Sequence, residues 1–360
     1  MTNPVLGFFA PWLVYTGILG LHVVLPARSI EGYAIDGRGE RLRYRINGLL
    51  TFAVSLVIWA IAGYSGVLPW DWLWQHRWWG AAGACVLGVL LSLAAMAWAP
   101  STGRSFVAQY FFGRAENPRL FGGRADAKMV LYLVGAILLE LNLLSFVAHH
   151  VLAYPGDPSP GVILYAALLT WFVVDYLVFE RVHLYTYDLF AERVGFKLIW
   201  GCLAWYPWFY CVGLWAVAAL PNAGAPAWLL VLASLTFFAG WTLARGANMQ
   251  KYAFKRDPGR PFLERFPQTS ISDGRRRLLC GGFWGVSRHV NYLGEILMAT
   301  GLALSLGRPS ELGPWLYPLY YLLLLVPRER DDDRRCAAKY GELWERYRER
   351  VPWRIVPRLY

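Results

Sequence analysis

A series of apolar runs, each near the length of a membrane-spanning helix, constrains the fold of this chain more than any other feature. A helix of about 20 mostly apolar residues crosses the hydrocarbon core of a bilayer. Only 16% of the residues are charged, whereas soluble domains carry about 25%. The sequence predicts an all-α, polytopic transmembrane helix bundle of about nine to ten spans and excludes an ordinary soluble enzyme. The runs cover about residues 8–25, 48–68, 79–99, 130–152, 162–179, 196–220, 228–244, 291–306 and 315–326.

The loops between these runs alternate between basic and nearly neutral. Arginine and lysine gather at residues 38–45, 104–128 and 245–288, whereas residues 155–160 and 221–226 carry almost no charge. Basic loops lie on the cytoplasmic side of membrane proteins. We therefore expect a multi-pass protein with its N-terminus outside and its C-terminus in the cytosol. The first residues lack the basic start and small-residue cleavage site of a signal peptide, so they are interpreted as the first span.

The net charge of +11 is unevenly distributed. Residues 245–360 hold 21 Lys and Arg against 12 Asp and Glu, a net charge of +9. This excess indicates anionic ligands and membrane lipids rather than nucleic acid. The five Cys form no CxxC and no His/Cys cluster, so neither a disulfide framework nor a metal site is predicted.

Several polar residues lie inside or beside the apolar runs. Glu140 and Asn142 fall in the run at 130–152, and Glu180 to Asp188 (ERVHLYTYD) crowd acids, His and Tyr into a short stretch. Ionisable groups at mid-membrane cost a few kcal/mol and usually face a protein interior or cavity. Tyr206 and Tyr210 are four apart on one helical face, and a buried phenol needs a hydrogen-bond partner. A solvated loop for the acids and a structural hydroxyl for each Tyr remain alternatives.

Two C-terminal segments combine cations, small residues and aromatic rings. Residues 245–256 place Lys251 and Lys255 four apart, so that one helical face presents two ammonium groups. Residues 281–295, GGFWGVSRHVNYLGE, join glycines that allow close backbone approach with side chains that stack or hydrogen-bond. The first pattern suits a phosphate group, and the second suits a flat ring.

A third segment, residues 326–357, is predicted to be largely helical. It places Arg328 four residues before Asp332, and Tyr340 seven residues before Tyr347 on nearly the same face. An amphipathic helix on anionic lipid is the alternative. Together the three segments would form a pocket at the cytosolic face that suits a phosphorylated, aromatic cofactor such as NADPH. Because no strand–GxGxxG–helix unit is present, a Rossmann domain is excluded as the site.

These residues resemble the sterol reductase family, which includes Δ14-sterol reductases, 7-dehydrocholesterol reductase, Δ24(28)-sterol reductases and the membrane domain of the lamin B receptor. The resemblance runs from about residue 43 onward. It rests on RINGLL (45–50), FFG..ENPR (111–119), D....E...L.T.D (175–188), P..Y (207–210), LLCGGFWGVSRHVNYLGE (278–295) and RCAAKYGELWERYRERVPWRIVP (335–357).

The resemblance implies a polytopic enzyme that uses NADPH to reduce a carbon–carbon double bond in a sterol taken from the bilayer. It implies one integral membrane domain over residues 1–360, with an N-terminal bundle part (1–160) and a catalytic part (161–360) that holds the sterol cavity and the NADPH pocket. One departure is Asp331, where relatives commonly carry Arg, so the local ion pairs must differ. By matching position, the cofactor residues would be Lys251, Lys255, Trp284, Arg288, Asn291, Arg328, Asp332, Tyr340 and Tyr347.

The chemistry requires two different groups. An isolated or conjugated sterol alkene is not electrophilic, so hydride addition needs prior or concerted protonation, and a buried acid must accompany the nicotinamide. We predict Tyr210 on the proton side, with Glu180 and Asp188 in support. His289, near the cofactor residues, is the alternative.

Other readings stay open. An S-adenosylmethionine-dependent membrane methyltransferase of the isoprenylcysteine carboxyl type shares an RH..Y.G…E-like pattern, although such enzymes usually place Pro after the RH pair, where this chain has Val290. A non-enzymatic lipid sensor is a third reading. Among reductases the Δ14 bond is favoured over Δ7 and the side-chain Δ24 and Δ24(28) bonds, because the chain is compact. No obligate protein partner is evident.

Overall fold

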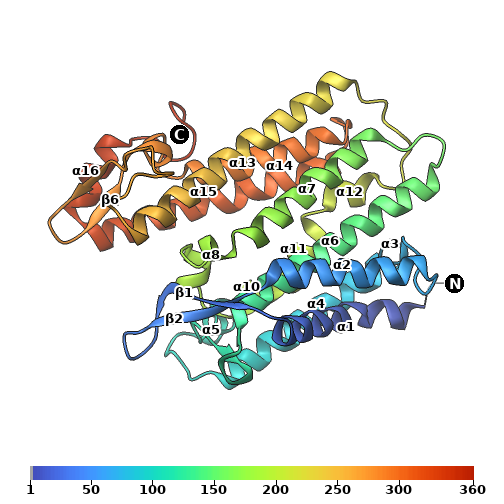
Figure 1. Ribbon diagram of the computed structural model, residues 1–360, viewed down its shortest axis with the longest axis horizontal. Coiled ribbons are helices and arrows are strands. Elements are labelled where there is room, and N and C mark those ends of the chain that lie inside the picture. The colour runs from blue at the N-terminus through green and yellow to red at the C-terminus, as the bar shows by residue number, and fades with distance from the viewer. Residues whose placement is uncertain (1–2) are drawn as a thin grey trace. The chain divides into compact units, whose positions relative to one another are not determined.

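The computed structural model describes residues 3–360 and is mostly helical (Figure 1). Five of its helices are long and apolar enough to cross a membrane: α1 (Pro4–Val24), α4 (Arg77–Trp98), α6 (Ala127–Ala153), α7 (Pro160–Val178) and α13 (Ala227–Arg256). A shorter apolar helix, α2, spans Gly48–Tyr64. The prediction of an integral membrane protein is thus confirmed, whereas the count of nine to ten spans is not confirmed by these lengths.

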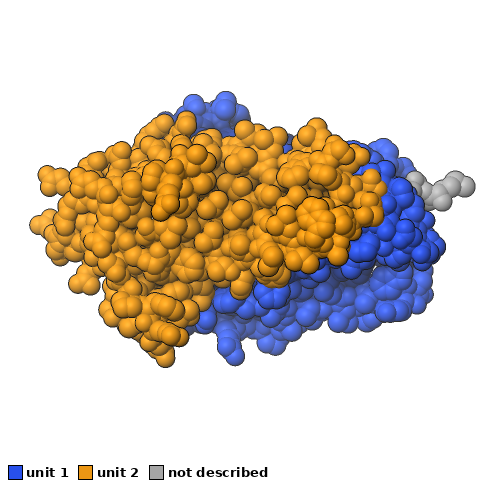
Figure 2. Space-filling model, turned by 90° about the horizontal axis from the view of Figure 1, so that it is seen from above, with its two compact units in different colours: residues 1–222 blue, residues 223–360 orange. Residues whose placement is uncertain are grey.

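Contacts between residues divide the chain into two compact units, residues 1–222 and residues 223–360 (Figure 2). The functional division predicted near residue 160 stays a prediction.

Helix α6 forms the core of unit 1. Its N-terminus is capped by Asp126, whose Oδ1 accepts the backbone N–H groups of Lys128 and Met129, each at 3.1 Å. Most of the helix is buried, and it contacts α1, α7 and the short α3 (Trp72–Gln75). Its intramembrane Glu140 is 1% exposed and accepts a hydrogen bond from Thr170 at 2.8 Å. A polar group inside this bundle is therefore held by another helix of the same unit.

The run at 196–220 does not form one continuous span, contrary to the expectation. It consists of α10 (Phe196–Trp200), the π-helical segment η2 (Gly201–Trp205), α11 (Tyr206–Phe209) and α12 (Val212–Val217). Pro207 has no N–H to donate to the preceding turn, and π segments break the regular helical ladder. The Asn142 side chain of α6 donates to the Pro207 carbonyl at 3.0 Å, which satisfies one backbone group at this break.

The structure also contains three small antiparallel hairpins, so the chain is mostly helical rather than all-α. The basic loop near residue 38 is the hairpin of β1 (Arg28–Ile35) and β2 (Arg41–Ile46). The others pair β3 (Arg119–Leu120) with β4 (Ala125–Asp126), and β5 (Ser270–Ser272) with β6 (Arg277–Leu279). Their charged sequences carry no apolar alternation long enough to reveal strands. The remaining short helices of unit 1 are α5 (Phe106–Phe112), η1 (Phe121–Gly123), α8 (Glu180–His183) and α9 (Tyr187–Phe190).

Unit 2 is built on the close pair of α13 and α14 (Val290–Ser305), which lie side by side in Figure 1. Gly294 faces α13, where a Cβ atom would lie 2.8 Å from the Cβ of Ala244. Small residues let membrane helices approach closely. Helix α15 (Leu312–Tyr340) packs on α14 and ends at Gly341, whose φ of +56° favours glycine. The short η3 (Gly282–Gly285) precedes α14, and α16 (Glu342–Arg350) leads into the C-terminal residues.

Candidate functional site

In unit 2 the structure brings Lys251 and Trp284 together. The Lys251 Nζ lies 4.9 Å from the centre of the Trp284 ring, a cation–π contact. The indole N–H of Trp284 donates to the Ala247 carbonyl at 2.8 Å, one turn earlier on α13. Trp284 is 8% exposed. Its ring is therefore fixed in place under the ammonium group, and Lys255 follows one turn further along the same face of α13.

A residue that sequence analysis did not single out, Gln250, fixes the turn before Trp284. It is 2% exposed, donates to the Gly281 carbonyl at 3.1 Å and accepts the Phe283 N–H at 3.0 Å. Gly282, between these two residues, has a φ of +62°, and a Cβ atom there would collide with the Gln250 amide. The feature that could have revealed Gln250 is its polar side chain on the buried side of α13.

His289 and Asn291 each present a buried polar atom to the interior of unit 2. Among residues 3–360, His289 Nε2 and Asn291 Oδ1 have no hydrogen-bond partner. The His289 ring stacks on Tyr292, with 4.8 Å between the ring centres. Burial, together with the nearby cations Lys251, Arg288, Arg328 and Arg354, lowers the pKa of His289 to about 3. The imidazole is thus neutral near pH 7, which suits hydrogen bonding better than the donation of a proton from an imidazolium.

Asp332 lies on the side of α15 that faces Lys251. Its Oδ2 accepts the Tyr292 hydroxyl at 2.8 Å, which ties α15 to α14. Arg328 and Asp332 are both within electrostatic range of Lys251. Arg328 and Asp332 thus bring a second cation and one carboxylate near Lys251.

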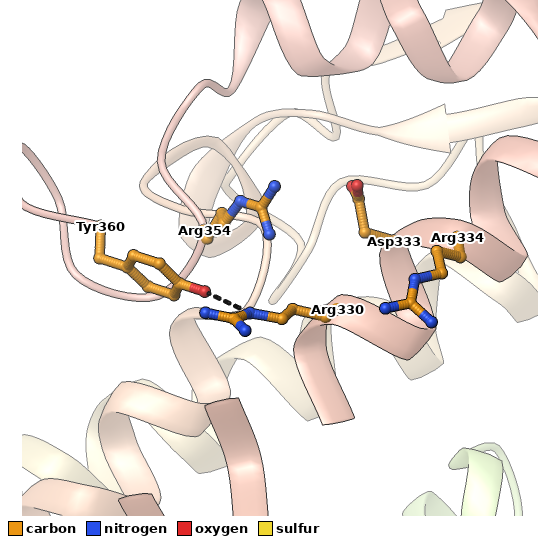
Figure 3. A pocket seen from close by; sticks show the side chains of 5 residues that line it. All are labelled: Arg330, Asp333, Arg334, Arg354 and Tyr360. Atoms are coloured by element: carbon orange, nitrogen blue, oxygen red, sulfur yellow. Dashed lines mark hydrogen bonds between the residues drawn. The ribbon is translucent and has the colours of Figure 1, made fainter. Parts of the chain in front are cut away.

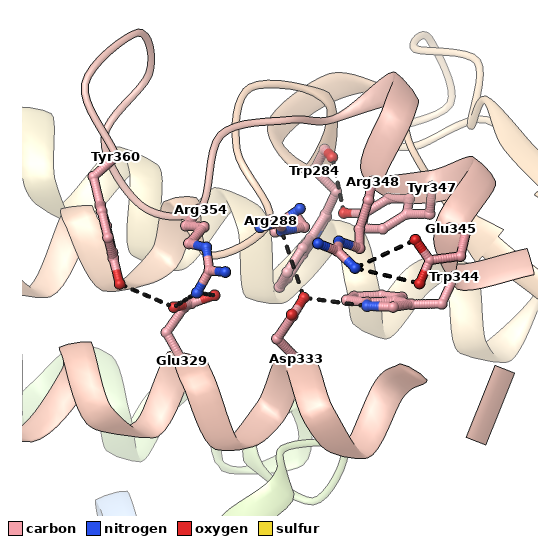
Figure 4. Close-up of polar contacts among 10 residues, drawn as sticks. All are labelled: Trp284, Arg288, Glu329, Asp333, Trp344, Glu345, Tyr347, Arg348, Arg354 and Tyr360. Atoms are coloured by element: carbon pink, nitrogen blue, oxygen red, sulfur yellow. Dashed lines mark hydrogen bonds and ion pairs between the residues drawn. The ribbon is translucent and has the colours of Figure 1, made fainter. Parts of the chain in front are cut away.

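Arg288 lies on a neighbouring side of the same cluster. It is 5% exposed, and its Nε lies 4.0 Å from Asp333 Oδ1. Asp333 also accepts the Trp344 indole N–H at 3.1 Å (Figure 4). Asp331, the departure from relatives, instead pairs with Arg334 at 3.5 Å on the exposed side of α15.

Tyr340 and Tyr347 do not share one helix, contrary to the expectation, because α15 ends at Tyr340 and Gly341 turns the chain into α16. The exposed Arg276 lies 5.8 Å over the Tyr340 ring, as a cation–π contact. Tyr347 is 3% exposed and donates its hydroxyl to the Trp284 carbonyl at 3.3 Å. Burial raises the pKa of Tyr347. The position of Tyr347 is thus that of a support beneath Trp284.

In unit 1 the Glu180 carboxylate is held by the backbone. It is 3% exposed, and its Oε2 accepts the Gly48 N–H at 3.0 Å. Gly48 begins α2, so the acid caps a helix N-terminus, where a negative charge is favourable. Burial nevertheless raises the pKa of Glu180 to about 7. The RINGLL motif therefore has a physical role, since its glycine leaves room for this carboxyl group.

Asp188, the other predicted acid, lies near Tyr176, which sequence analysis did not single out. Tyr176 lies within electrostatic range of Glu180, Asp188 and Tyr206. Its ring centre is 4.1 Å from that of His183. The phenol of Tyr176 is thus the group common to both predicted acids. In the sequence, Tyr176 is marked only by its place next to Asp175 in an apolar run.

Tyr210 lies one turn after Tyr206, and their rings meet edge to face at 4.5 Å. Its backbone carbonyl accepts the Tyr165 hydroxyl at 3.0 Å, which ties α7 to the interrupted span. The break at η2 and Pro207 sets the direction of these two rings.

A cavity of about 510 Å³ lies elsewhere in unit 2, and none of its lining residues belongs to the predicted cofactor set (Figure 3). Arg330 donates its Nε–H to the Tyr360 hydroxyl at 3.3 Å across this cavity. Arg330 comes two residues after Arg328, which places the two on different faces of α15. The lining residues are Arg330, Asp333, Arg334, Arg354 and Tyr360.

The membrane-length helices of both units define an integral membrane protein, and the basic, aromatic cluster lies in unit 2. The model of the ergosterol biosynthesis ERG4/ERG24 family matches residues 3–360. The chain therefore belongs to this sterol reductase family.

Three relatives illustrate the similarity, each named a Delta(14)-sterol reductase. The protein of Arabidopsis thaliana is 33% identical over 97% of this chain and 94% of its own length. The Mus musculus protein TM7SF2 is 34% identical over 98% of this chain and 86% of its own. The protein of Methylotuvimicrobium alcaliphilum is 30% identical over 98% and 83%.

Proposed function

We propose that this protein is an NADPH-dependent sterol reductase that saturates the Δ14 double bond of a sterol taken from the bilayer. The observation that carries the proposal is the cluster of Lys251, Trp284 and His289 with Asn291. It combines a cation over an aromatic ring with two buried polar atoms that lack a partner among the described residues. The names of the relatives support the choice of substrate and bond.

The residues of unit 2 fit the chemical parts of NADPH. Lys251, Lys255 and Arg328 offer positive charge for phosphate groups. His289 Nε2 and Asn291 Oδ1 are buried and unpaired among residues 3–360, and buried polar atoms normally have a partner, so a bound amide or hydroxyl group would satisfy them. When bound, NADPH supplies the hydride. Arg288, Asp332 and Tyr340 complete the cluster, with Tyr347 as the support of Trp284.

The proton side of the reaction belongs to unit 1. We propose that Tyr210, Glu180 and Asp188, together with Tyr176, form the relay that delivers the proton to the substrate. The raised pKa of Glu180 keeps this carboxyl partly protonated near pH 7, which a proton relay requires. His289, held neutral by burial, is assigned to hydrogen bonding on the cofactor side. We also propose that the cofactor site faces the cytosol, in agreement with the basic loops.

A panel of substrates tests the proposal. Membranes that contain the protein would be incubated with Δ14, Δ7, Δ24 and Δ24(28) sterols and NADPH, and the products identified by mass spectrometry. We expect saturation of the Δ14 sterol alone. Saturation of another bond would overturn the Δ14 assignment but not the assignment as a reductase. Saturation of none of these sterols would favour the lipid sensor.

A thermal-shift comparison tests the cofactor. We expect NADPH to raise the melting temperature of the detergent-solubilised protein. Lys251→Met should need at least a tenfold higher NADPH concentration for the same rise, because one cation that would contact a phosphate is removed. Stabilisation by S-adenosylmethionine and not by NADPH would replace the reductase with the methyltransferase.

A further inference from the structure

Glu329 is a fully buried carboxylate that the proposed reaction does not use. It lies on α15 with 0% exposure. Arg354 Nη1 lies 3.1 Å from its Oε2, and the Tyr360 hydroxyl lies 3.5 Å from the same oxygen (Figure 4). A buried charge is tolerated only when it is paired and hydrogen-bonded. Both partners belong to residues 351–360, named here the C-terminal strap.

The C-terminal strap holds the backbone of the segment that carries the proposed cofactor residues. The Trp353 carbonyl accepts the Arg288 N–H at 2.9 Å, and the Arg354 carbonyl accepts the His289 N–H at 2.8 Å. The Ile355 carbonyl accepts the hydroxyl of Ser287, which is 0% exposed, at 2.8 Å. Each of the three consecutive residues 287–289 therefore donates a hydrogen bond to the strap.

The strap itself is a closed turn. A main-chain oxygen of Tyr360 accepts the N–H groups of Arg354, Ile355 and Val356 at 2.8, 2.9 and 3.1 Å. The cavity of Figure 3 lies beside Arg354 and Tyr360, so on this side polar contacts rather than packed apolar side chains attach the strap to α15. Release of the Arg354 side chain would therefore loosen the whole turn.

Asp333, one turn after Glu329 on α15, contacts the Arg288 side chain at 4.0 Å. Two carboxylates at i and i+4 thus act on the same segment. Asp333 fixes the Arg288 side chain directly, whereas Glu329 fixes the Arg288 and His289 backbone through the strap.

We infer that Glu329 is a positioning residue for the cofactor site, acting through Arg354 and the C-terminal strap on Arg288 and His289. This inference rests on the proposed function, because Arg288 and His289 matter only if the cluster binds NADPH. Among residues 3–360, the side-chain hydrogen bonds of Glu329 go to Arg354 and Tyr360, outside the proposed NADPH set, and its charge also acts on Arg288.

The first arm of the test needs no cofactor. Hydrogen–deuterium exchange of the full-length solubilised protein would be followed in peptides that cover residues 285–292 and 227–244. Glu329→Gln, which keeps the shape and removes the charge, is expected to accelerate exchange at 285–292 and leave 227–244 unchanged. Asp331→Asn, which removes the carboxylate of an exposed pair on the same helix, is the matched control and is expected to match wild type. Unchanged exchange at 285–292 in Glu329→Gln would overturn the inference.

The second arm measures NADPH binding and turnover. Glu329→Gln is expected to raise the Kd and KM for NADPH roughly tenfold, the value for one lost charge-assisted contact, with the KM for sterol within about twofold of wild type. A general loss of structure would instead lower kcat and raise both KM values. Faster exchange with an unchanged NADPH Kd would overturn the positioning role.

Two further variants keep the inference testable. Tyr360→Phe removes one hydroxyl and is expected to give a smaller effect in the same direction, which serves if Glu329→Gln fails to fold. Glu329→Gln combined with Arg354→Gln is expected to be less harmful than the sum of the single variants, because the two charges act as a pair. If the wild-type protein binds no NADPH, the proposed function fails, and so does the role of Glu329 toward the cofactor site. The hydrogen–deuterium exchange then still shows whether Glu329 holds residues 287–289 in place.

Discussion

Gly48 stands where the N-terminus of α2 meets the Glu180 carboxyl group. A Cβ atom at this position would lie 2.8 Å from Glu180 Cδ and closer still to Oε1. The carboxyl group would have to move away from the Gly48 N–H that it accepts at 3.0 Å. The glycine of the RINGLL motif is therefore required by a close approach rather than by a turn.

Gly48→Ala is expected to destabilise the protein by about 1–3 kcal/mol, the cost of forcing an extra methyl group into a packed site. Thermal unfolding in detergent measures this loss. Gly17→Ala is the control, because a Cβ atom there meets nothing within 4 Å and α1 gains helix propensity. Equal melting temperatures for Gly48→Ala and Gly17→Ala would refute the contact.

Glu180 gives the protein a pH dependence of definite sign. Its pKa is about 7 in the folded chain and near 4.5 in the unfolded chain. Between these values the folded state binds more protons, so the Glu180 contribution makes stability fall as the pH rises. Below about pH 4.5 the penalty is absent, and above about pH 7 it is complete.

We expect Glu180→Gln to gain stability relative to wild type as the pH rises from about 5 to about 8, by up to about 1.4 kcal/mol for each unit of the raised pKa. Unfolding of both proteins across this range measures the difference. A difference that does not change with pH would show that Glu180 titrates normally. If Glu180 also serves the proton relay, wild-type activity should decline above about pH 7, and Glu180→Gln should have little activity at any pH.

At the scale of elements, hydropathy predicted the regular helices well and the interrupted ones poorly. The runs at 48–68 and 162–179 became α2 and α7 with nearly the same bounds. The run at 196–220 has the same apolar composition, yet its π segment and Pro207 break it, because hydropathy reports burial and not the hydrogen-bond ladder. Helix α15 extends to Tyr340 because charged residues prolong a helix whose apolar signal ends near residue 326.

Part of the candidate site could also be predicted from the sequence. Lys251, Trp284 and His289 stand in distinctive segments, and the structure brings them together. Glu329 was hidden in a run of alternating charges, and its importance depends on Arg354, which is 25 residues away. Contacts between residues so far apart cannot be inferred from local spacing.

The pairing of α13 and α14 leads to a prediction at this scale. Gly294→Ala is expected to push the helices apart, since the added Cβ would lie 2.8 Å from the Ala244 side chain and as close as 2.5 Å to the Gly240 carbonyl oxygen. Because α13 carries Lys251, both the melting temperature and the affinity for NADPH should fall. Gly20→Ala on α1, where a Cβ meets nothing within 4 Å, should lower neither. Wild-type melting and affinity in Gly294→Ala would show that the two helices are not closely packed there.

At the scale of the whole molecule, the excess positive charge and the buried acid Glu180 fall in different units. The net charge of +9 in residues 245–360 falls entirely within unit 2, which holds the cluster around Lys251. Unit 1 holds the buried acid Glu180 and the phenols around it. The reaction proposed here requires both an anion-binding part and a proton-donating part, and the chain provides each.

The transfer of deuterium from NADPH to sterol tests the central proposal most directly. Purified protein would be supplied with a Δ14 sterol and NADPH deuterated at both C4 positions, and the product analysed by mass spectrometry. We expect one deuterium in the saturated sterol from the labelled cofactor, and a second one only when the solvent is D₂O. A saturated product without deuterium from the cofactor, or no saturated product at all, would contradict the assignment of this chain as an NADPH-dependent sterol reductase.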